Sequence, residues 1–166
     1  MAKALLITRK DVIKFTAMSG GIDTDKFIQF VSIAQDKHIE NYLGTDLLEA
    51  IQTKITGSTL TGDYLTLVNE YCKPALIHWT MVEFLPYSSY TIAQKGVFKH
   101  SSENADTASR DEIDYLLEKE RNTAQYYTER LIEYLSFNAS SKFPEYYTNT
   151  NEDVSPDKDI FGGWVL

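Results

Sequence analysis

The stretch at residues 74–85, PALIHWTMVEFL, is apolar on nearly every side of a helix. Only His78, Thr80 and Glu83 interrupt it. A surface helix shows one apolar stripe, whereas a helix that is apolar most of the way round must be surrounded by protein. The pattern therefore predicts a buried central helix in an all-α fold, a helical bundle whose other helices pack around this one.

Periodic apolar positions and capping residues predict the helices that come before it. Thr8 and Asp11 resemble a capping box, so a first short helix is expected to begin at Arg9. Asp23 or Thr24 caps the next helix. Apolar residues at spacings of three and four then predict helices over residues 24–43, 46–56 and 63–72, with Gly44 joining the first two in a tight corner.

Prolines mark the two ends of the central helix. Pro74 lacks an amide hydrogen, so it either kinks the helix at residues 63–72 or begins the next one. Pro86 disturbs the far end, after which the chain is expected to resume helically to Gly96. Residues 97–108 show no helical period, and they predict an extended loop of a length that is often functional.

A second capping box, from Ser109 to Glu112, opens the longest predicted helix, residues 110–137. At 1.5 Å per residue such a helix spans roughly 42 Å. Its apolar seam has one acidic interruption, Glu120. The opposite face is expected to meet water or another subunit, and it carries Asp114, Glu118, Arg121, Glu129 and Glu133.

After Asn138 the chain becomes polar and loses its helical signal, yet it ends in apolar residues. We therefore expect two parts, a helical domain over residues 1–138 and an extended C-terminal arm over residues 139–166. The apolar tip around Trp164 is expected to dock, either on its own domain or on a neighbouring molecule. Residues 3–7 are expected to be extended, and either pair with a neighbour or simply lead in.

Composition narrows the classes of function. The net charge of −8 repels phosphate backbones, so sequence-specific binding of nucleic acid is not expected. No apolar run approaches the roughly 20 residues that span a bilayer, so no membrane association is expected. The single cysteine, Cys72, excludes a disulfide framework and favours a protein made in a cytoplasm. The 11 tyrosines suit either a core or a protein interface.

No catalytic motif, cofactor motif or metal-ligand spacing is present, and neither enzymatic activity nor a cofactor is expected. His38 and His78 lie on predicted packing faces and are interpreted as structural histidines. His100 neighbours two serines and a glutamate, but nothing in the sequence orients them as a catalytic group. Cys72 is interpreted as a buried apolar residue.

The order of elements resembles the head–tail connector (adaptor) proteins of tailed bacteriophages. Residues 5–8 (LLIT) precede a short helix, and residues 33–44 (IAQDKHIENYLG) resemble the family pattern that closes the second helix with Tyr-Leu-Gly. Residues 74–79 (PALIHW) match the family's next buried helix. The loop and the long final helix are most similar to the ring proteins of crAss-like phages, and the resemblance covers about residues 3–138.

The resemblance implies a structural virion protein that forms a homo-oligomeric ring beneath the portal and joins the head to the tail. The ring would be closed and head-to-tail, a dodecamer if it follows portal symmetry, and DNA would pass through its channel without sequence-specific binding. The implied partners are other copies, the portal protein and the next tail or connector ring. The implied location is the virion neck, assembled in the cytoplasm of the host bacterium.

We assign hypothetical interface residues to the loop and the arm: Val97, Phe98, His100, Phe143, Tyr146, Tyr147, Phe161, Trp164, Val165 and Leu166. Two alternatives remain open at this point. One is an intracellular helical adaptor or regulatory interaction module, which accounts equally well for the helices and the acidity. The other, less favoured, is an enzyme whose site surrounds His38 or His78.

Overall fold

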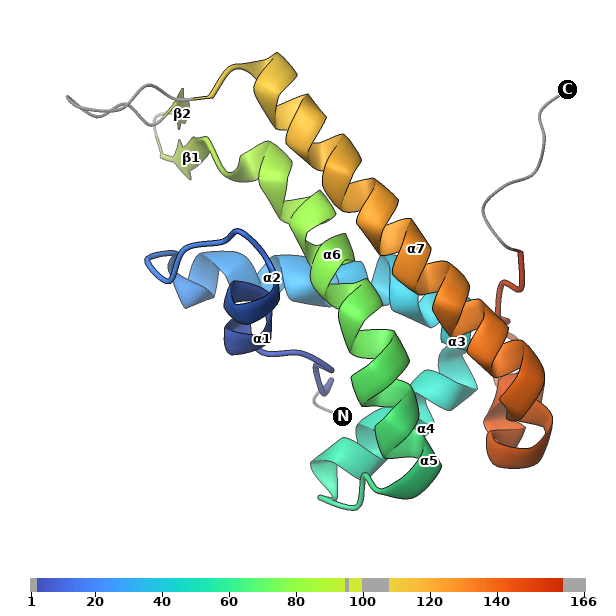
Figure 1. The fold of residues 1–166 in the computed structure, drawn as a ribbon. Coiled ribbons are helices and arrows are strands. Elements are labelled where there is room, and N and C mark those ends of the chain that lie inside the picture. The colour runs from blue at the N-terminus through green and yellow to red at the C-terminus, as the bar shows by residue number, and fades with distance from the viewer. Residues whose placement is uncertain (1–2, 95, 100–107, 160–166) are drawn as a thin grey trace, which may run out of the picture.

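The computed structural model describes residues 3–94, 96–99 and 108–159. Within these ranges the fold is all-α apart from one β-hairpin, as expected (Figure 1). The elements in chain order are α1 (Arg9–Phe15), α2 (Thr24–Ala34), α3 (Glu40–Leu43), α4 (Thr45–Thr56), α5 (Gly62–Thr66), α6 (Lys73–Phe84), β1 (Tyr90–Ala93), β2 (Gly96–Lys99) and α7 (Arg110–Lys142).

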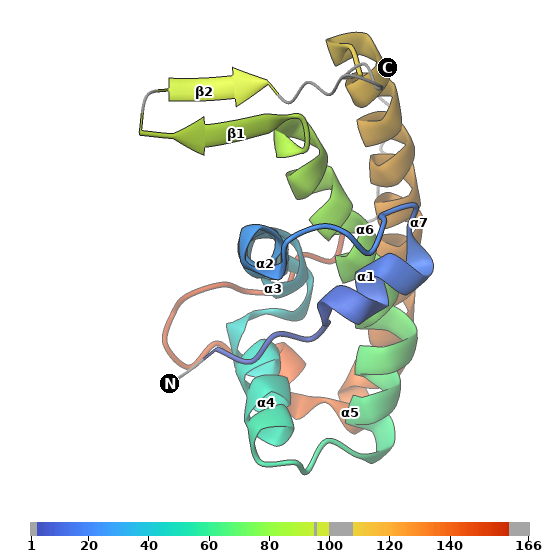
Figure 2. The same ribbon diagram turned by 90° about the vertical axis from the view of Figure 1, so that its left-hand side faces the viewer.

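Helix α6 is the central helix that its apolar sequence predicts. It lies alongside α7 and crosses α2, with α1 packed nearby (Figures 1 and 2). Residues on every side of α6 are buried: Ala75, Leu76, Ile77, Trp79, Thr80, Met81 and Val82. The prediction of a buried central helix is therefore confirmed.

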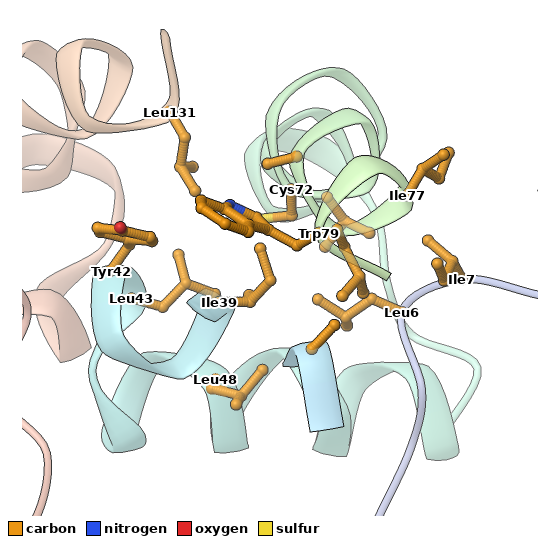
Figure 3. Packing of buried hydrophobic residues seen from close by; sticks show 14 of the residues in the cluster. Leu6, Ile7, Ile39, Tyr42, Leu43, Leu48, Cys72, Ile77, Trp79 and Leu131 are labelled. Carbon is orange, nitrogen blue, oxygen red and sulfur yellow. The ribbon is translucent and has the colours of Figure 1, made fainter. Parts of the chain in front are cut away.

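Trp79 lies at the centre of the core. Its ring sits between Leu131 of α7 and the apolar side chains of Ile39 and Leu43 (Figure 3). The indole N–H donates to the Thr128 hydroxyl at 2.9 Å, so its one polar group is satisfied inside the core.

Two π-helical segments interrupt the predicted helices without ending them. Gln35–Ile39 joins α2 to α3, and Leu67–Cys72 joins α5 to α6. The first segment holds Gln35, a buried polar residue whose side chain accepts from the Leu6 N–H at 2.9 Å and donates to the Ala4 carbonyl at 3.0 Å. Residues 4–6 therefore pair with a side chain of their own domain.

Predicted helix ends agree closely with the structure near capping residues. Helix α1 begins at Arg9, and the Asp11 carboxylate accepts from the Thr8 N–H at 2.7 Å. The capping box at Ser109 and Glu112 opens α7 at Arg110. Pro74 is the second residue of α6, as one of the two predicted alternatives has it, although the backbone stays helical through Cys72.

Three predictions are wrong. The chain after Pro86 forms the antiparallel pair β1–β2, in register Ala93↔Gly96, instead of resuming as a helix. Strand β2, Gly96–Lys99, also takes up residues 97–99 of the predicted loop, and residues 100–107 lie outside the described ranges. Helix α7 continues to Lys142, past the predicted boundary between domain and arm at residue 138.

Candidate assembly surfaces

The start of the predicted arm belongs to the core. Phe143 is 0% exposed and Tyr146 is 3% exposed, so their prediction as interface residues is wrong. Pro144 begins a short 3₁₀ helix, Pro144–Tyr147, that turns the chain back against α4 and α7. Phe143 meets the Tyr64 ring edge-on at 5.1 Å between centroids. Tyr147, by contrast, is 56% exposed and stays available to a partner.

Residues 148–159, which we call the arm segment, dock on the corner between α3 and α4. The corner, residues 41–46, contains the Tyr-Leu-Gly sequence. Because Gly44 joins the two helices without a loop, backbone groups at both helix ends lack partners within the helices. The arm segment supplies them: the Asp157 N–H donates to the Asn41 carbonyl at 2.7 Å, and the Thr45 N–H donates to the Val154 carbonyl at 3.0 Å.

Gly44 is required at this corner for two separate reasons. Its φ of +76° is a conformation that residues with a side chain rarely adopt. A Cβ at this position would also lie 2.8 Å from Pro156 Cδ, well inside van der Waals contact. The glycine therefore both makes the corner and lets the arm segment approach it.

Asp46 fixes the beginning of the arm segment. Its carboxylate accepts from the Thr148 hydroxyl and from the Thr150 hydroxyl, the latter at 2.7 Å, and from the Thr150 N–H at 3.1 Å. These hydrogen bonds, that of Thr148 first, hold the pKa of Asp46 below its ordinary value. The described part of the arm thus docks on its own domain. The tip residues Phe161, Trp164, Val165 and Leu166 lie outside the described ranges, and their docking stays a prediction.

The β-hairpin stands away from the core (Figure 2), and the first turns of α7 lie at the same end of the molecule (Figure 1). Val97, one of the predicted interface residues, is 64% exposed on β2. Phe98 lies on the same strand, and His100 lies outside the described residues. Helix α7 contributes no fully buried residue before Ala124, although the helix begins at Arg110.

The two described histidines make specific internal contacts, as their interpretation as structural residues expects. His38 stacks on Trp79 with ring centroids 3.8 Å apart, and its Nε2 is 3.0 Å from Glu83 Oε1. Burial lowers the pKa of His38, although Glu83 opposes the shift. His78 Nδ1 is 2.7 Å from Glu120 Oε2, which explains the acidic interruption in the α7 seam.

Cys72 and the remaining ionisable groups offer no reactive cluster within the described residues. Cys72 is fully buried, and burial raises the pKa of its thiol. In the described part of the chain, no group of three or more His, Cys, Asp or Glu side chains is arranged to hold a metal ion. No helix there is long and apolar enough to cross a membrane.

Sequence reasoning missed the exposed aromatic residues of α7. Tyr115, Tyr126 and Phe137 recur every eleven residues and are 60%, 57% and 83% exposed. An eleven-residue spacing is close to three full helical turns, so the three rings lie along one line, opposite the buried face. That spacing was present in the sequence and marks the same face that was expected to meet water or another subunit.

Comparisons with known proteins place the chain in a family without assigning it an activity. A search of curated proteins and a search of solved structures both found no match. The profile of a family of unknown function, DUF6712, matches residues 39–156. The match includes both the Gly44 corner and most of the arm segment that docks on it. Because it covers most of the chain, the protein belongs to the DUF6712 family.

Proposed function

We propose that the protein is a structural virion protein of a tailed bacteriophage, a connector that forms a ring beneath the portal. Copies of the chain join head-to-tail around the portal axis, and the ring links the head to the tail while DNA passes through its channel. The proposal rests on the resemblance of residues 5–8, 33–44 and 74–79 to connector proteins, together with one structural observation.

That observation is the first part of α7, where Leu117 and Glu120 contact the core but no side chain before Ala124 is fully buried. Most of the stability of a helix in a protein comes from packing of its apolar face rather than from helix propensity. Residues 110–123 have no fully buried side chain, and the hairpin beside them exposes Val97. A partner that covers this part of the molecule supplies the packing that the single chain lacks, which favours an assembly over a free monomer.

The charge of the chain is consistent with a DNA channel. A lumen that bound phosphates tightly would retard the passing genome, whereas a chain with a net charge of −8 repels it. Salt screens this repulsion beyond about a Debye length, so the repulsion keeps the DNA from adhering to the channel wall without blocking its passage.

The native mass of the purified chain, alone and mixed with the portal encoded near it, tests the proposal. A closed ring in either sample is the expected result, and its mass gives the symmetry. A ring that needs the portal identifies the portal as the template. A monomer in both samples at concentrations well above a micromolar contradicts the proposal and favours the intracellular adaptor.

Limited proteolysis gives an independent measurement. Residues 97–108 are expected to be cut readily in the free chain and to be protected in the ring. Equal protection in both states would show that this segment takes no part in assembly.

A further inference from the structure

One face of α7 is exposed along most of the helix and carries an aromatic ring every eleven residues. Tyr115, Tyr126 and Phe137 are each more than half exposed, on the side of α7 opposite its buried residues. Further exposed side chains lie between these rings on the same face: Lys119, Asn122, Arg130 and Glu133. Each of these residues is three or four positions from the next, so together with the rings they form one continuous stripe, which we call the α7 stripe.

The α7 stripe has the same spacing in both directions from Tyr126. Tyr115 and Phe137 each lie eleven residues from it, and Lys119 and Glu133 each lie seven residues from it. Two stripes placed face to face and antiparallel therefore bring complementary side chains to the same height. The two Tyr126 rings meet at the centre, and each Tyr115 meets the other copy's Phe137. Each Lys119 then lies opposite the Glu133 of the other copy.

The charges select the antiparallel orientation. In a parallel pair in register, Lys119 would face Lys119 and Glu133 would face Glu133, and facing like charges repel. The antiparallel pair replaces both repulsions with attractions. It also places Arg130 level with the neutral Asn122, and the Arg130 guanidinium lies over the Tyr71 ring of its own chain, 5.9 Å from the centroid.

Lys119 and Glu133 are not occupied within their own chain. Among the described residues neither side chain takes part in an ion pair, and Arg130 makes none with Glu133 although it is three residues away. The Lys119 ammonium lies 5.3 Å from the centroid of the Tyr115 ring, so it stays within the α7 stripe. Both charges are therefore in place for a partner.

We propose that two copies of the chain pair through their α7 stripes, antiparallel and about a two-fold axis at Tyr126. From Tyr115 to Phe137 the stripe is roughly 33 Å long, and a helix is about 10–12 Å wide, so the contact covers roughly 350 Å² of each copy. A standard interface covers about 800 Å² of each partner. The pair is therefore expected to form at high concentration and to dissociate on dilution.

This contact is separate from the ring of the proposed function. An isologous contact joins two copies and then stops, whereas a ring requires a head-to-tail contact that repeats around an axis. The inference does not rest on the proposed function, because free copies can pair through α7 whether or not they also enter a ring.

Sedimentation of the full chain from the micromolar to the millimolar range tests the pairing. The wild type is expected to show a monomer–dimer equilibrium. Lys119→Glu places two carboxylates opposite each other at both ends of the contact, so it should raise the dissociation constant at least tenfold. A wild-type chain that stays monomeric at every concentration, or unchanged association of Lys119→Glu, overturns the inference.

Arg121→Glu is the matched control. It makes the same change of charge at an exposed position of α7, but one that lies about 140° around the helix from Tyr126. It should associate like the wild type, and both variants should melt like the wild type because both sites are exposed. Equal weakening by Arg121→Glu would mean that net charge controls association, and it overturns the inference.

A double reversal tests the direct pairing of the two charges. Glu133→Lys alone should weaken association as Lys119→Glu does. A chain that carries both substitutions again places a carboxylate opposite an ammonium at each end, so its dissociation constant should return to about the wild-type value. A double variant that associates as weakly as the single variants overturns the inference.

These outcomes are distinct from those that decide the ring. Dimers that are lost in Lys119→Glu, with no closed ring in any sample, support the pair and contradict the ring. A wild-type chain that forms a ring with the portal but never a dimer alone overturns the pair and leaves the ring proposal standing.

Discussion

The requirement for glycine at position 44 can be measured as the loss of stability caused by a single substitution. Gly44→Ala is expected to lower the free energy of unfolding by about 3 kcal/mol, because it adds a contact with Pro156 to a backbone strain of order 1–3 kcal/mol. Gly62→Ala is the matched control: Gly62 has a φ of +60° but nothing within 4 Å of an added Cβ, so it measures strain alone. Urea unfolding of both variants checks the prediction, and equal losses would contradict it.

A double-mutant cycle identifies the arm segment as the source of the difference. Pro156→Ala removes the two ring carbons that an alanine at position 44 would meet. We therefore expect Gly44→Ala to be less destabilising in a Pro156→Ala background. Strict additivity would mean that the arm segment is not seated on the corner in solution.

His38 gives the stability a dependence on pH whose sign follows from its burial. Burial lowers the pKa of His38 from its ordinary value of 6.5, so the unfolded chain binds a proton at a pH where the folded chain does not. The His38 contribution is therefore complete above pH 6.5 and is lost as the pH falls toward the folded value. His38→Gln is expected to reduce the fall in unfolding free energy between pH 7 and 5. Identical slopes in the two proteins would count against it.

At the residue scale, the sequence predicted the roles of individual side chains better than it predicted which residues they contact. It indicated that His38 and His78 are structural and that Cys72 is buried, because the residue types and their helical faces carry that information. It did not indicate Glu83 or Glu120 as their partners. Those contacts join residues more than forty positions apart, and local periodicity contains no information about such pairs.

At the scale of elements, the predicted boundaries were correct where capping residues mark the start of a helix. The predictions failed where tertiary contacts determine the type or the end of an element. Helices α1 and α7 begin where their capping boxes stand. The hairpin was missed because Gln94 and Lys95, which separate the two strands, are not one of the Asn-Gly or Asp-Gly pairs that indicate a tight hairpin turn, although both strands contain β-branched and aromatic residues. The end of α7 was missed because Phe143 and the turn at Pro144, rather than a glycine, terminate it.

The two halves of α7 are expected to differ in local stability. Amide hydrogens of residues 113–121 should exchange at least about tenfold faster than those of residues 127–139, because only the second half is anchored by buried residues such as Leu131 and Leu135. Hydrogen exchange of the free chain checks this. The difference should shrink in an assembled ring. Uniform protection along the free helix would show that the first half needs no partner.

At the scale of the whole molecule, the chain is one folded domain with a C-terminal segment that crosses back to its first half. The family match over residues 39–156 spans both the Gly44 corner and the segment that docks there. The sequence indicated that a polar, aromatic-tipped arm would dock, and left open whether its own domain or a neighbour receives it. Residues 148–159 dock on their own domain through backbone groups of Asn41 and Thr45, which no side-chain pattern reports, while the docking of the tip stays a prediction.

Three nested truncations separate the parts of this C-terminal segment. A chain of residues 1–142 is expected not to fold cooperatively, because it lacks Phe143 and Tyr146, and removing a buried phenyl ring alone costs about 3–5 kcal/mol. A chain of residues 1–147 keeps both rings but loses the hydrogen bonds at the corner, each contributing about 1 kcal/mol, so it should fold with a melting temperature lower by several degrees.

The third truncation, residues 1–160, removes only the apolar tip. Its monomer is expected to melt like the full chain, while its assembly weakens, because the tip docks on a neighbour under the proposed function. Circular dichroism and native mass measure the two properties on one sample. A lower melting temperature in the isolated monomer would instead place Trp164 on its own domain. In that case the aromatic side chains that join subunits would be expected on the described surface, above all at Phe137, because the arm would bind only to its own chain.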